Sequence, residues 1–460
     1  MGDSVKTEVK FFFQTRKVPP WLNKTLIALI PKKLGPKTIN HFRLISLCNT
    51  SYKVVSKILV LRMKHLMPIL VSPSQAAFVT GRRGSDNVIV AQELLYAMES
   101  MKGRIGYMII KINLEKAYDR LEWGFVRNML LSLNFHLDTM ELIMSCISFT
   151  SVSLLFNGEQ LEEFQPSRGL RQGDPISPYI FILCMEFLSS LINKKCNDDV
   201  WDRIKASRNG PGFSHIFFVD DLLLFGKATQ ENCEAISEVL EEFCSTTGQK
   251  ISCEKSKVFF SPAVTAEDRA DLTHQLGISE TNNLGNYLGF PLWHKGRNMN
   301  EFLFVIDRVQ AKLAGWKANC LSPAGRLVLL KAAVTPIVEY YMQCCKLLAR
   351  VSERIGKLTR DFLWGSNDER RRLHLVGWEK VTNPPCIGGL SLFQVKARND
   401  AILAKFFWLI ASNPNVAWSR MLYSKYLTPA RLSARGRKYP ASRTWKACKV
   451  RGVIFNKGLK

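Results

Sequence analysis

The spacing of hydrophobic residues predicts strands that alternate with helices over the middle of the chain. Apolar runs typical of strands occupy residues 108–114, 152–157 and 216–225. Apolar residues with helical spacing occupy residues 54–66, 178–192 and 230–247. Strands interleaved with helices indicate an α+β layered structure.

The two flanking regions differ from this pattern. From residue 21 to about residue 98, short apolar runs such as LIALIPKK and FRLISL alternate with basic residues, Pro and Gly, which predicts a small mixed α/β lobe. Beyond about residue 300, helical spacing dominates, as in GRLVLLKAAVTPIVEYYMQ and NDAILAKFFWLIA, with loop signals at residues 383–389. The C-terminal third is therefore expected to be mostly helical.

No segment of the sequence predicts contact with a membrane. The longest apolar run, residues 179–192, is too short to span a bilayer and contains Glu186, so we expect a buried helix. The N-terminus is charged where a signal peptide is apolar, and Lys6 stands where a myristoylation signal needs Ser or Thr. The twelve cysteines are scattered without zinc-ligand spacing, as in reduced proteins. We expect a soluble intracellular protein, with nucleus or cytoplasm left open.

The charge balance suggests the kind of partner. The 460 residues include 64 Lys and Arg against 39 Asp and Glu, a formal net charge of +25. Such a field attracts polyanions, so nucleic acid is the first partner to consider, with a ribosome-associated or merely basic protein as the alternative. A hydrophobic content of 47% is enough for a sizeable core. The net charge therefore indicates a class of partner but no particular reaction.

The strongest chemical signal is HIFFVDDLLLF, in which Asp220 and Asp221 interrupt an apolar hairpin pattern. For an isolated Asp-Asp pair, a tight turn facing water is the more common explanation. Here both flanks are apolar, which predicts a hairpin packed on both sides, and carboxylates in such a place are stabilised by a divalent cation. Two-metal phosphoryl transfer needs a further carboxylate from another strand. The candidate is YMIIKINLEKAYD, a strand that runs into a turn and a helix, with Asn113 near the end of the strand.

Three segments in order resemble the palm motifs of reverse transcriptases of non-LTR, LINE-type retrotransposons. They are IKINLEKAYDRLEW, SRGLRQGDPISPYIF and FVDDLLLF. WLNKTLIALIPKK, FRLISLCNTSYKVVSKILVLRM and QAAFVTGRRGSDN are similar to the finger motifs, GQKISCEKSKVFFS to the fourth palm motif and LGNYLGFPL to the primer grip. The later LSPAGRLVLLKAAVTPIVEYYMQ, FLWG and GGLSLFQVKARNDAILAKFFW are similar to the thumb and downstream helices of plant-type elements.

This resemblance implies an α+β right-hand polymerase fold with a mostly helical C-terminal extension. The fingers are expected at residues 1–98, the palm at 99–265, a thumb-like region at 266–350 and the extension at 351–460. The chain is expected to be a fragment of a retrotransposon polyprotein that starts after an endonuclease domain and ends before any zinc-ligand or RNase H segment.

The resemblance also implies which residues form the active site. Asp220 and Asp221 match the metal-binding pair, and Asn113 stands at the position of the first catalytic aspartate. Lys255 matches the basic residue of the fourth palm motif, a candidate proton donor to the leaving pyrophosphate. The implied cofactor is Mg²⁺, with Mn²⁺ as a substitute.

A second group is expected at the nucleotide. Arg43 matches the finger arginine on the triphosphate, for which a guanidinium is suited, and Lys32 is a weaker candidate for the same task. Tyr118 matches the aromatic residue that closes off the 2′ side of the sugar. Gln172 and Gly173 match positions near the template base and nucleotide, Gly allowing close backbone approach.

Asn113 is the main departure from the family pattern, because an amide carries no charge and bridges two cations poorly. Glu115 would share a face with it in a continuing strand, and Asp119 is more plausible as a cap or salt-bridge partner. Leu44 and Val219 replace a usual proline and a frequent alanine, both milder changes.

The expected reaction is RNA-templated DNA synthesis from a DNA primer and deoxynucleoside triphosphates, reduced by the loss of one carboxylate. One alternative is a catalytically dead polymerase fold that still binds RNA or an RNA/DNA hybrid, and another is an RNA-binding protein that resembles intron maturases. The sequence contains no GxGxxG, GxxxxGK[ST] or GxSxG, so hydride transfer, Walker-type hydrolysis and acyl transfer find no support. It leaves the oligomeric state and the template open.

Overall fold

The computed structural model describes residues 2–101, 106–148, 150–292, 302–313, 320–366, 372–412, 416–427 and 441–449. The chain divides into two compact units. Unit 1 comprises Met1–Asn87, Met98–Ile204 and Gly212–Leu284, and unit 2 comprises Val88–Ala97, Lys205–Pro211 and Gly285–Lys460. Helix α4 (Gly84–Ser100) contributes its middle to unit 2 and its two ends to unit 1.

The first of two four-stranded sheets in unit 1 has the order β2-β1-β4-β5. Its strands are β1 (Lys24–Pro31), β2 (Phe42–Cys48), β4 (Ser151–Phe156) and β5 (Glu159–Gln160). Strand β1 pairs antiparallel with β2 and parallel with β4, which joins segments more than 100 residues apart. Asn157 and Gly158 connect β4 to β5 with φ values of 50° and 89°, the left-handed pair that favours Asn-Gly in a hairpin turn.

The other sheet, called the central sheet below, has the order β10-β3-β9-β8 and is antiparallel throughout. Its strands are β3 (Tyr107–Asn113), β8 (His215–Phe218), β9 (Asp221–Lys227) and β10 (Lys257–Phe260). Met108, Ile109, Ile110 and Ile112 of β3 are all buried, because protein covers both faces of this strand. The strands predicted at residues 108–114 and 216–225 are confirmed, the latter as a hairpin.

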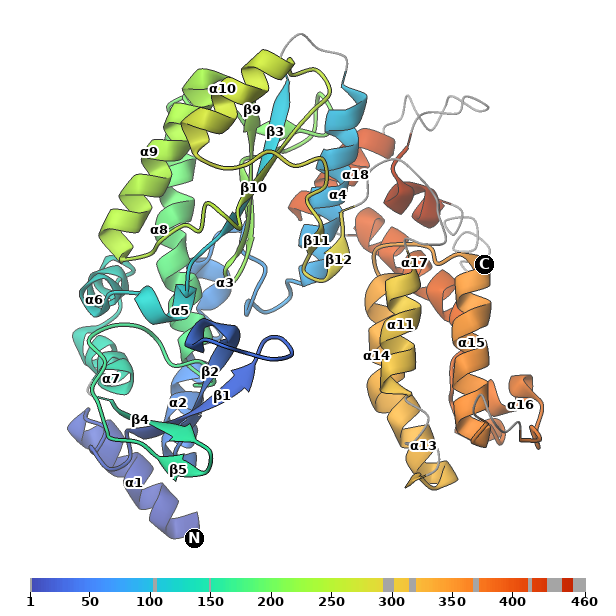
Figure 1. Ribbon diagram of the computed structural model, residues 1–460, viewed down its shortest axis with the longest axis horizontal. Helices are drawn as coiled ribbons and strands as arrows, with labels where there is room; N and C mark the ends of the chain where they lie inside the picture. Colours follow the sequence, from blue (N-terminus) through green and yellow to red (C-terminus); the bar gives the residue numbers. More distant parts are fainter. Residues whose placement is uncertain are drawn as a thin grey trace. The chain divides into compact units, whose positions relative to one another are not determined.

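Helices share one core with the central sheet, and several of them lie beside it in Figure 1. Those of unit 1 are α1 (Gly2–Thr15), α2 (Thr50–Met63), α3 (Met67–Leu70), α5 (Ala117–Arg120), α6 (Trp123–Ser132), α7 (Leu137–Ile147), α8 (Ser177–Asn197), α9 (Gln230–Thr247) and α10 (Ala266–Leu276). Helix α9 starts where the Thr229 side chain accepts the Asn232 N–H, and it ends at Gly248 with φ 78°. The apolar run at residues 179–192 lies in α8 as a buried helix.

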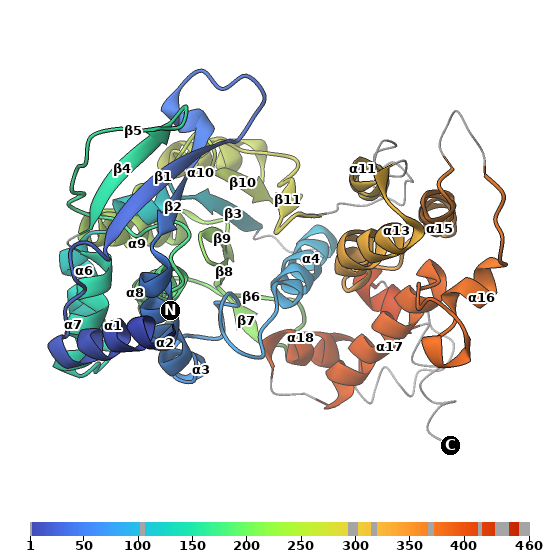
Figure 2. The same ribbon diagram turned by 90° about the horizontal axis from the view of Figure 1, so that it is seen from below.

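Unit 2 is mostly helical, as the sequence predicts for this part of the chain (Figure 2). Its helices are α11 (Leu303–Lys312), α13 (Pro323–Leu329), α14 (Thr335–Met342), α15 (Ala349–Trp364), α16 (Trp378–Thr382), α17 (Val395–Ser412) and α18 (Ala417–Tyr426). The short ribbons of the chain are β6 (Ile204–Lys205) with β7 (Gly212–Phe213) and β11 (Asn286–Tyr287) with β12 (Phe290–Pro291). No helix among the described residues is long and apolar enough to cross a membrane.

The segment GRLVLLKAAVTPIVEYYMQ is not one regular helix. A π-helical turn, Leu330–Val334, separates α13 from α14 just before Pro336. Proline has no N–H to donate and its ring crowds the preceding turn, so the helix widens there. The Thr335 hydroxyl donates to the Leu330 carbonyl at 3.1 Å and satisfies part of the loosened turn.

Candidate active site

The register of the central sheet brings Asn113 opposite Asp221. These two residues are the last Cα partners of the β3–β9 ladder, so their side chains start within about 5.5 Å of each other. On the other side, Phe218 pairs with Asp221 and closes the β8–β9 hairpin. Two of the three residues expected at the metals therefore meet at one end of the two inner strands, and Asp220 precedes Asp221 in the adjacent turn.

The turn itself consists of Val219 and Asp220. Val219 has φ 58°, and Asp220 is not among the residues of positive φ, the pattern of a type II′ turn, whose first position normally holds glycine. A β-branched residue in this conformation costs on the order of 1–3 kcal/mol and persists only where its surroundings hold it. The strain lies one residue before the exposed Asp220.

The electrostatics of the two carboxylates favour a cation between them. Loss of water raises the pKa of Asp220 above its usual value, even though part of the residue stays exposed. Burial and the neighbouring Asp220 raise the pKa of Asp221, while Lys111 opposes that rise. Adjacent carboxylates that are partly desolvated gain more from a divalent ion than exposed ones do.

Asn113 makes three hydrogen bonds to the segment that precedes β10. Its N–H donates to the Ser256 Oγ at 3.1 Å, and its carbonyl accepts the Ser252 N–H at 2.8 Å. Its side-chain Nδ2 donates to the main-chain carbonyl of Lys255 at 3.0 Å. The amide thus makes a bond that a carboxylate, which only accepts, cannot make.

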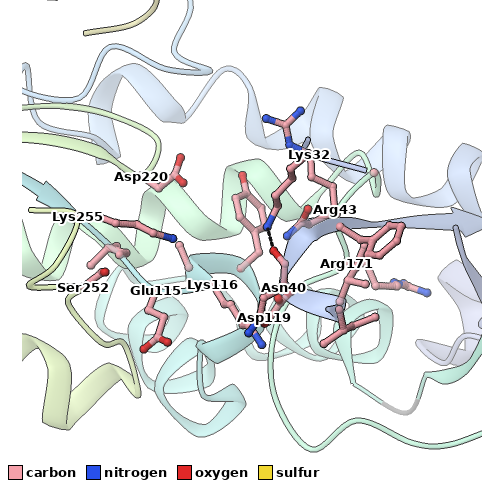
Figure 3. Close-up of a pocket in the computed structure, with 18 of the residues that line it drawn as sticks. Lys32, Asn40, Arg43, Glu115, Lys116, Asp119, Arg171, Asp220, Ser252 and Lys255 are labelled. Atoms are coloured by element: carbon pink, nitrogen blue, oxygen red, sulfur yellow. Dashed lines mark hydrogen bonds between the residues drawn. The ribbon is translucent and has the colours of Figure 1, made fainter. Parts of the chain in front are cut away.

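A pocket of about 620 Å³ lies beside the ends of β3 and β9 (Figure 3). Seven of the nine site residues expected from the sequence line it: Lys32, Arg43, Tyr118, Gln172, Gly173, Asp220 and Lys255. Asn113 and Asp221 are not among its lining residues. The lining carries five basic side chains, Lys32, Arg43, Lys116, Arg171 and Lys255, and three acidic ones, Glu115, Asp119 and Asp220. This excess of positive charge suits an anionic ligand.

The β1–β2 hairpin and α5 place the residues expected at the nucleotide. Lys32 follows β1 and donates from Nζ to the Asn40 carbonyl at 3.2 Å, while Arg43 lies on β2. Tyr118 on α5 stacks on Phe181, with ring centroids 4.7 Å apart and an interplanar angle of 9°. Burial raises the pKa of the Tyr118 hydroxyl, so it stays protonated at neutral pH.

Gln172 and Gly173 lie against β2. The Ser46 N–H donates to the Gln172 carbonyl at 2.7 Å. Gly173 has φ 107°, and a Cβ there would stand 3.0 Å from the Ser46 carbonyl oxygen. Both the conformation and the close approach of the backbone therefore require glycine at this position.

A buried ion pair stabilises the loop that carries Gln172 and Gly173. Arg171 donates to Asp174 at 3.1 Å and lies over the Tyr52 ring, 4.2 Å from its centroid. Asp174 also accepts from the Tyr52 hydroxyl at 2.5 Å and from the Ser56 hydroxyl at 2.6 Å. The Asp174 carboxylate is thus fully engaged in holding the loop that carries Gln172.

Glu115 does not take the place of the missing aspartate. Strand β3 ends at Asn113, and the Glu115 carboxylate pairs with Lys250 at 3.3 Å. In Figure 3 it points away from Asp220. Asp119 lines the pocket; burial raises its pKa, and Lys116, Lys32 and a hydrogen bond from Gln172 oppose that rise.

These residues fit a divalent cation only in part. Asp220 and Asp221 offer adjacent oxygen donors, the ligand type that Mg²⁺ and Mn²⁺ prefer. Within the described part of the chain, however, no three His, Cys, Asp or Glu side chains gather as a metal-binding group. Asn113 can add one neutral oxygen while its nitrogen bonds to Lys255.

The sequence matches one known protein family over residues 30–292, more than half of the chain. That family is described as reverse transcriptase (RNA-dependent DNA polymerase). The chain belongs to the reverse transcriptase family. The α+β right-hand polymerase fold expected from the sequence is confirmed, whereas the bounds of the four expected domains and the role of each site residue stay predictions.

Relatives of this chain include proteins of retrotransposable elements. The chain is 25% identical over 377 residues to the retrovirus-related Pol polyprotein of the type-2 retrotransposable element R2DM of Drosophila melanogaster, covering 79% of this chain and 33% of that protein. It is 24% identical over 362 residues to the transposon TX1 uncharacterized 149 kDa protein of Xenopus laevis, covering 76% of this chain and 26% of that protein. It is also 46% identical over 67 residues to an uncharacterized mitochondrial protein of Arabidopsis thaliana, covering 15% of this chain and 55% of that protein.

The expected resemblance to non-LTR elements, with relatives in plants, is confirmed by these matches. The chain spans about a quarter to a third of the length of the two retrotransposon proteins.

Sequence reasoning missed several residues that shape the site. Lys116, with φ 51° at the start of α5, lines the pocket, and so does the buried Arg171. The Gln75 side chain accepts a hydrogen bond from the N–H of Val219, which precedes Asp220 in the hairpin turn and lies 144 residues away in the sequence. The φ at residue 116 gave no sequence signal, whereas Arg171 lies inside the LRQGDP motif and could have been selected there.

Proposed function

We propose that this chain is the RNA-directed DNA polymerase domain of a retrotransposon polyprotein and that Asn113 strongly reduces its activity. The observation that carries the proposal is the register of β3 with β9, which pairs Asn113 with Asp221 next to a basic pocket. Family membership supplies the reaction class, and the pocket supplies charge of the right sign for a triphosphate.

Five of the lining residues serve the incoming nucleotide and its template base in this proposal. Arg43 and Lys32 bind the triphosphate of the incoming deoxynucleotide through charge-assisted hydrogen bonds. Tyr118, held flat against Phe181, excludes a 2′-hydroxyl from the sugar site. The rigid backbone at Gln172 and Gly173 supports the base pair that forms with the RNA template.

The remaining residues serve the reacting phosphate. Asp220 and Asp221 would hold Mg²⁺ or Mn²⁺, and a bound metal would supply charge stabilisation for the attacking and leaving oxygens. Lys255, whose side chain lines the pocket, donates a proton to the leaving pyrophosphate. Asn113 keeps its position but offers no charge, so the reacting groups are less well stabilised.

Primer extension tests the proposal directly. The natural protein and the Asn113→Asp variant are compared on one RNA template and DNA primer with Mg²⁺ or Mn²⁺ at fixed salt. We expect the variant to extend faster by about three orders of magnitude or more, since loss of charge stabilisation of several kcal/mol corresponds to such a factor. Equal extension by both proteins would show that Asn113 is not limiting, and no extension by either would refute polymerase activity in this chain.

A second candidate function is binding of an RNA/DNA hybrid without synthesis. The bond from Asn113 to Lys255 favours it, because it engages the side-chain nitrogen and leaves this residue only one neutral oxygen as a metal ligand. Hybrid affinity that falls steeply with salt, together with no extension by the natural protein, would support this function. Weak binding that does not depend on salt would refute it.

A further inference from the structure

The side chain of Gln75 is bonded to the turn that carries Asp220. Its Oε1 accepts the backbone N–H of Val219 at 3.2 Å and also the N–H of Ala77 at 3.0 Å. Val219 has φ 58°, and Phe78, next to Ala77, has φ 56°. One carboxamide oxygen therefore reaches two backbone segments that each contain a bulky residue in the left-handed region.

Main-chain bonds align Gln75 with the hairpin. The Phe217 N–H donates to the Ser74 carbonyl at 2.8 Å, and the Ala76 N–H donates to the Phe217 carbonyl at 3.1 Å. Gln75 thus forms a parallel bridge with Phe217, two residues before Val219. The Asn87 Nδ2 adds a bond to the Phe217 carbonyl at 2.8 Å. Ser74, Gln75 and Ala76 are thus aligned with β8 through a single isolated bridge.

Arg82 fixes this segment in turn. Its guanidinium donates to the carbonyls of Val71, Ser72 and Gln75, the last at 2.7 Å. Three main-chain carbonyls held by one planar group leave the segment little freedom to move. Hydrogen bonds therefore connect Val219 to Gln75, and Gln75 to Arg82.

Gln75 is poorly suited to a purely structural role. The residue is fully buried, and its Nε2 has no hydrogen-bond partner among the described residues. A buried amide with an unpaired donor is unfavourable, and an apolar side chain of the same length avoids that cost. What the carboxamide adds over such a side chain is the acceptor for Val219 and Ala77.

We propose that Gln75 is a positioning residue that orients Asp220 by holding Val219 in its left-handed conformation. Rotation about φ of Val219 moves the Asp220 carboxylate directly, because the two residues are adjacent. The proposal rests on the proposed polymerase function for its catalytic consequence, but the hold on the turn is measurable without any reaction.

A double-mutant cycle tests the proposal. Gln75→Met removes the acceptor while keeping the length of the side chain, and Val219→Gly removes the need for it, because glycine adopts positive φ freely. Gln92→Met is the matched control, a buried glutamine whose side chain bonds to Pro291 and Thr444 in unit 2. Hydrogen exchange of the peptide that spans residues 217–221 reports on the turn in the four proteins of the cycle and in the control.

We expect Gln75→Met to raise exchange in this peptide by about tenfold, in line with the loss of one buried hydrogen bond. In the Val219→Gly background the same change should have little further effect, and Gln92→Met should leave the peptide as in the natural protein. Unchanged exchange in Gln75→Met, or an equal increase in both backgrounds, would overturn the proposal.

The catalytic consequence is read in the Asn113→Asp background. Gln75→Met should lower the rate of single-nucleotide addition at saturating nucleotide by about tenfold, leave the nucleotide KM within about twofold, and lose its effect when Val219→Gly is present. A loss of rate that Val219→Gly does not relieve would show that Gln75 acts by packing alone. If Asn113→Asp does not extend a primer at all, the proposed function fails, and the exchange rates still decide whether Gln75 holds the turn.

Discussion

The Asn113 side chain donates a hydrogen bond to the main-chain carbonyl of Lys255 at 3.0 Å, across 142 positions of sequence. At the same place the Asn113 backbone bonds to Ser252 and Ser256. An aspartate at residue 113 would turn a carboxylate oxygen toward the Lys255 carbonyl. The residue that departs from the family pattern is therefore built into the contact between β3 and the segment before β10.

This contact predicts opposite effects of Asn113→Asp on stability and on metal response. Without divalent metal, the variant should lose about 0.5–1.5 kcal/mol in free energy of unfolding, because one solvent-exposed hydrogen bond is lost and two acceptors face each other. With Mg²⁺ or Mn²⁺ it should regain stability by mass action, since metal binds the three carboxylates of the folded state. Denaturant unfolding with and without metal measures both effects.

The natural protein is the control for the metal response and should show the smaller gain. A variant as stable as the natural protein without metal would mean that the Asn113–Lys255 bond contributes little to stability. A variant that is insensitive to metal would argue against a shared site at residues 113, 220 and 221.

Local pattern was enough to predict the elements that carry the site. Helix α9 has the predicted bounds, and the strand expected at residues 108–114 is β3, one residue shifted. Apolar periodicity identifies such elements because both faces of the central sheet are covered. The order of the three palm-like motifs then indicated that β3 and the β8–β9 hairpin belong together.

The long-range contacts were not readable from the same pattern. Gln75 begins the QAAFVTGRRGSDN segment, but that resemblance did not predict the bond from its side chain to Val219, which depends on how two distant segments pack. Glu115 was expected to share a face with Asn113 only if the strand continued, but the chain turns after Asn113. Sequence spacing gives the direction of a side chain only within an element, so contacts between elements need the structure.

The buried pair of Arg171 and Asp174 gives a prediction about stability. Asp174→Ala should cost about 3–5 kcal/mol in free energy of unfolding, because it leaves the buried Arg171 charge uncompensated. Glu122→Ala is the matched control, since Glu122 pairs with Arg168 at 3.0 Å with both side chains about 45% exposed. That change should cost less than about 1 kcal/mol. Similar costs for the two changes, measured by chemical denaturation, would contradict the structural role of Asp174.

Two glycines allow the cost of an unfavourable backbone conformation to be measured apart from the cost of a steric clash. Gly173 and Gly158 have φ values of 107° and 89°, but a Cβ on Gly173 would stand 3.0 Å from the Ser46 carbonyl while nothing lies within 4 Å of one on Gly158. Gly158→Ala should therefore cost about 1 kcal/mol from conformation alone, and Gly173→Ala distinctly more. Thermal unfolding of the two variants tests this order. A reversed order would mean that the loop at Gly173 shifts freely away from β2.

The last prediction concerns Glu186, a half-buried carboxylate on α8 that accepts the Ser72 N–H at 2.9 Å and the Ser72 hydroxyl at 3.3 Å. Burial raises the pKa of Glu186 from 4.5 to about 6, although the Ser72 bonds and the charge of Arg82 oppose that rise. His215, linked to it through Ser189 and Ser72, has its pKa lowered by burial to about 3 and so stays neutral above that pH.

Because the folded-state pKa of Glu186 is raised, its contribution to stability is complete below pH 4.5 and is lost as pH rises through about 6. In this window the folded protein keeps a proton that the unfolded chain releases. The loss amounts to at most about 2 kcal/mol, since one pKa unit corresponds to about 1.4 kcal/mol.

Glu186→Gln removes this titration. The difference in unfolding free energy between the variant and the natural protein should therefore shift in favour of the variant between pH 4.5 and pH 6.5 and then level off. Glu238→Gln, which removes a surface carboxylate paired with Lys195 at 2.6 Å, is the control and should not reproduce that shift. Chemical denaturation across this range decides the matter: a constant difference between Glu186→Gln and the natural protein would mean that Ser72 and Arg82 stabilise the charged carboxylate fully.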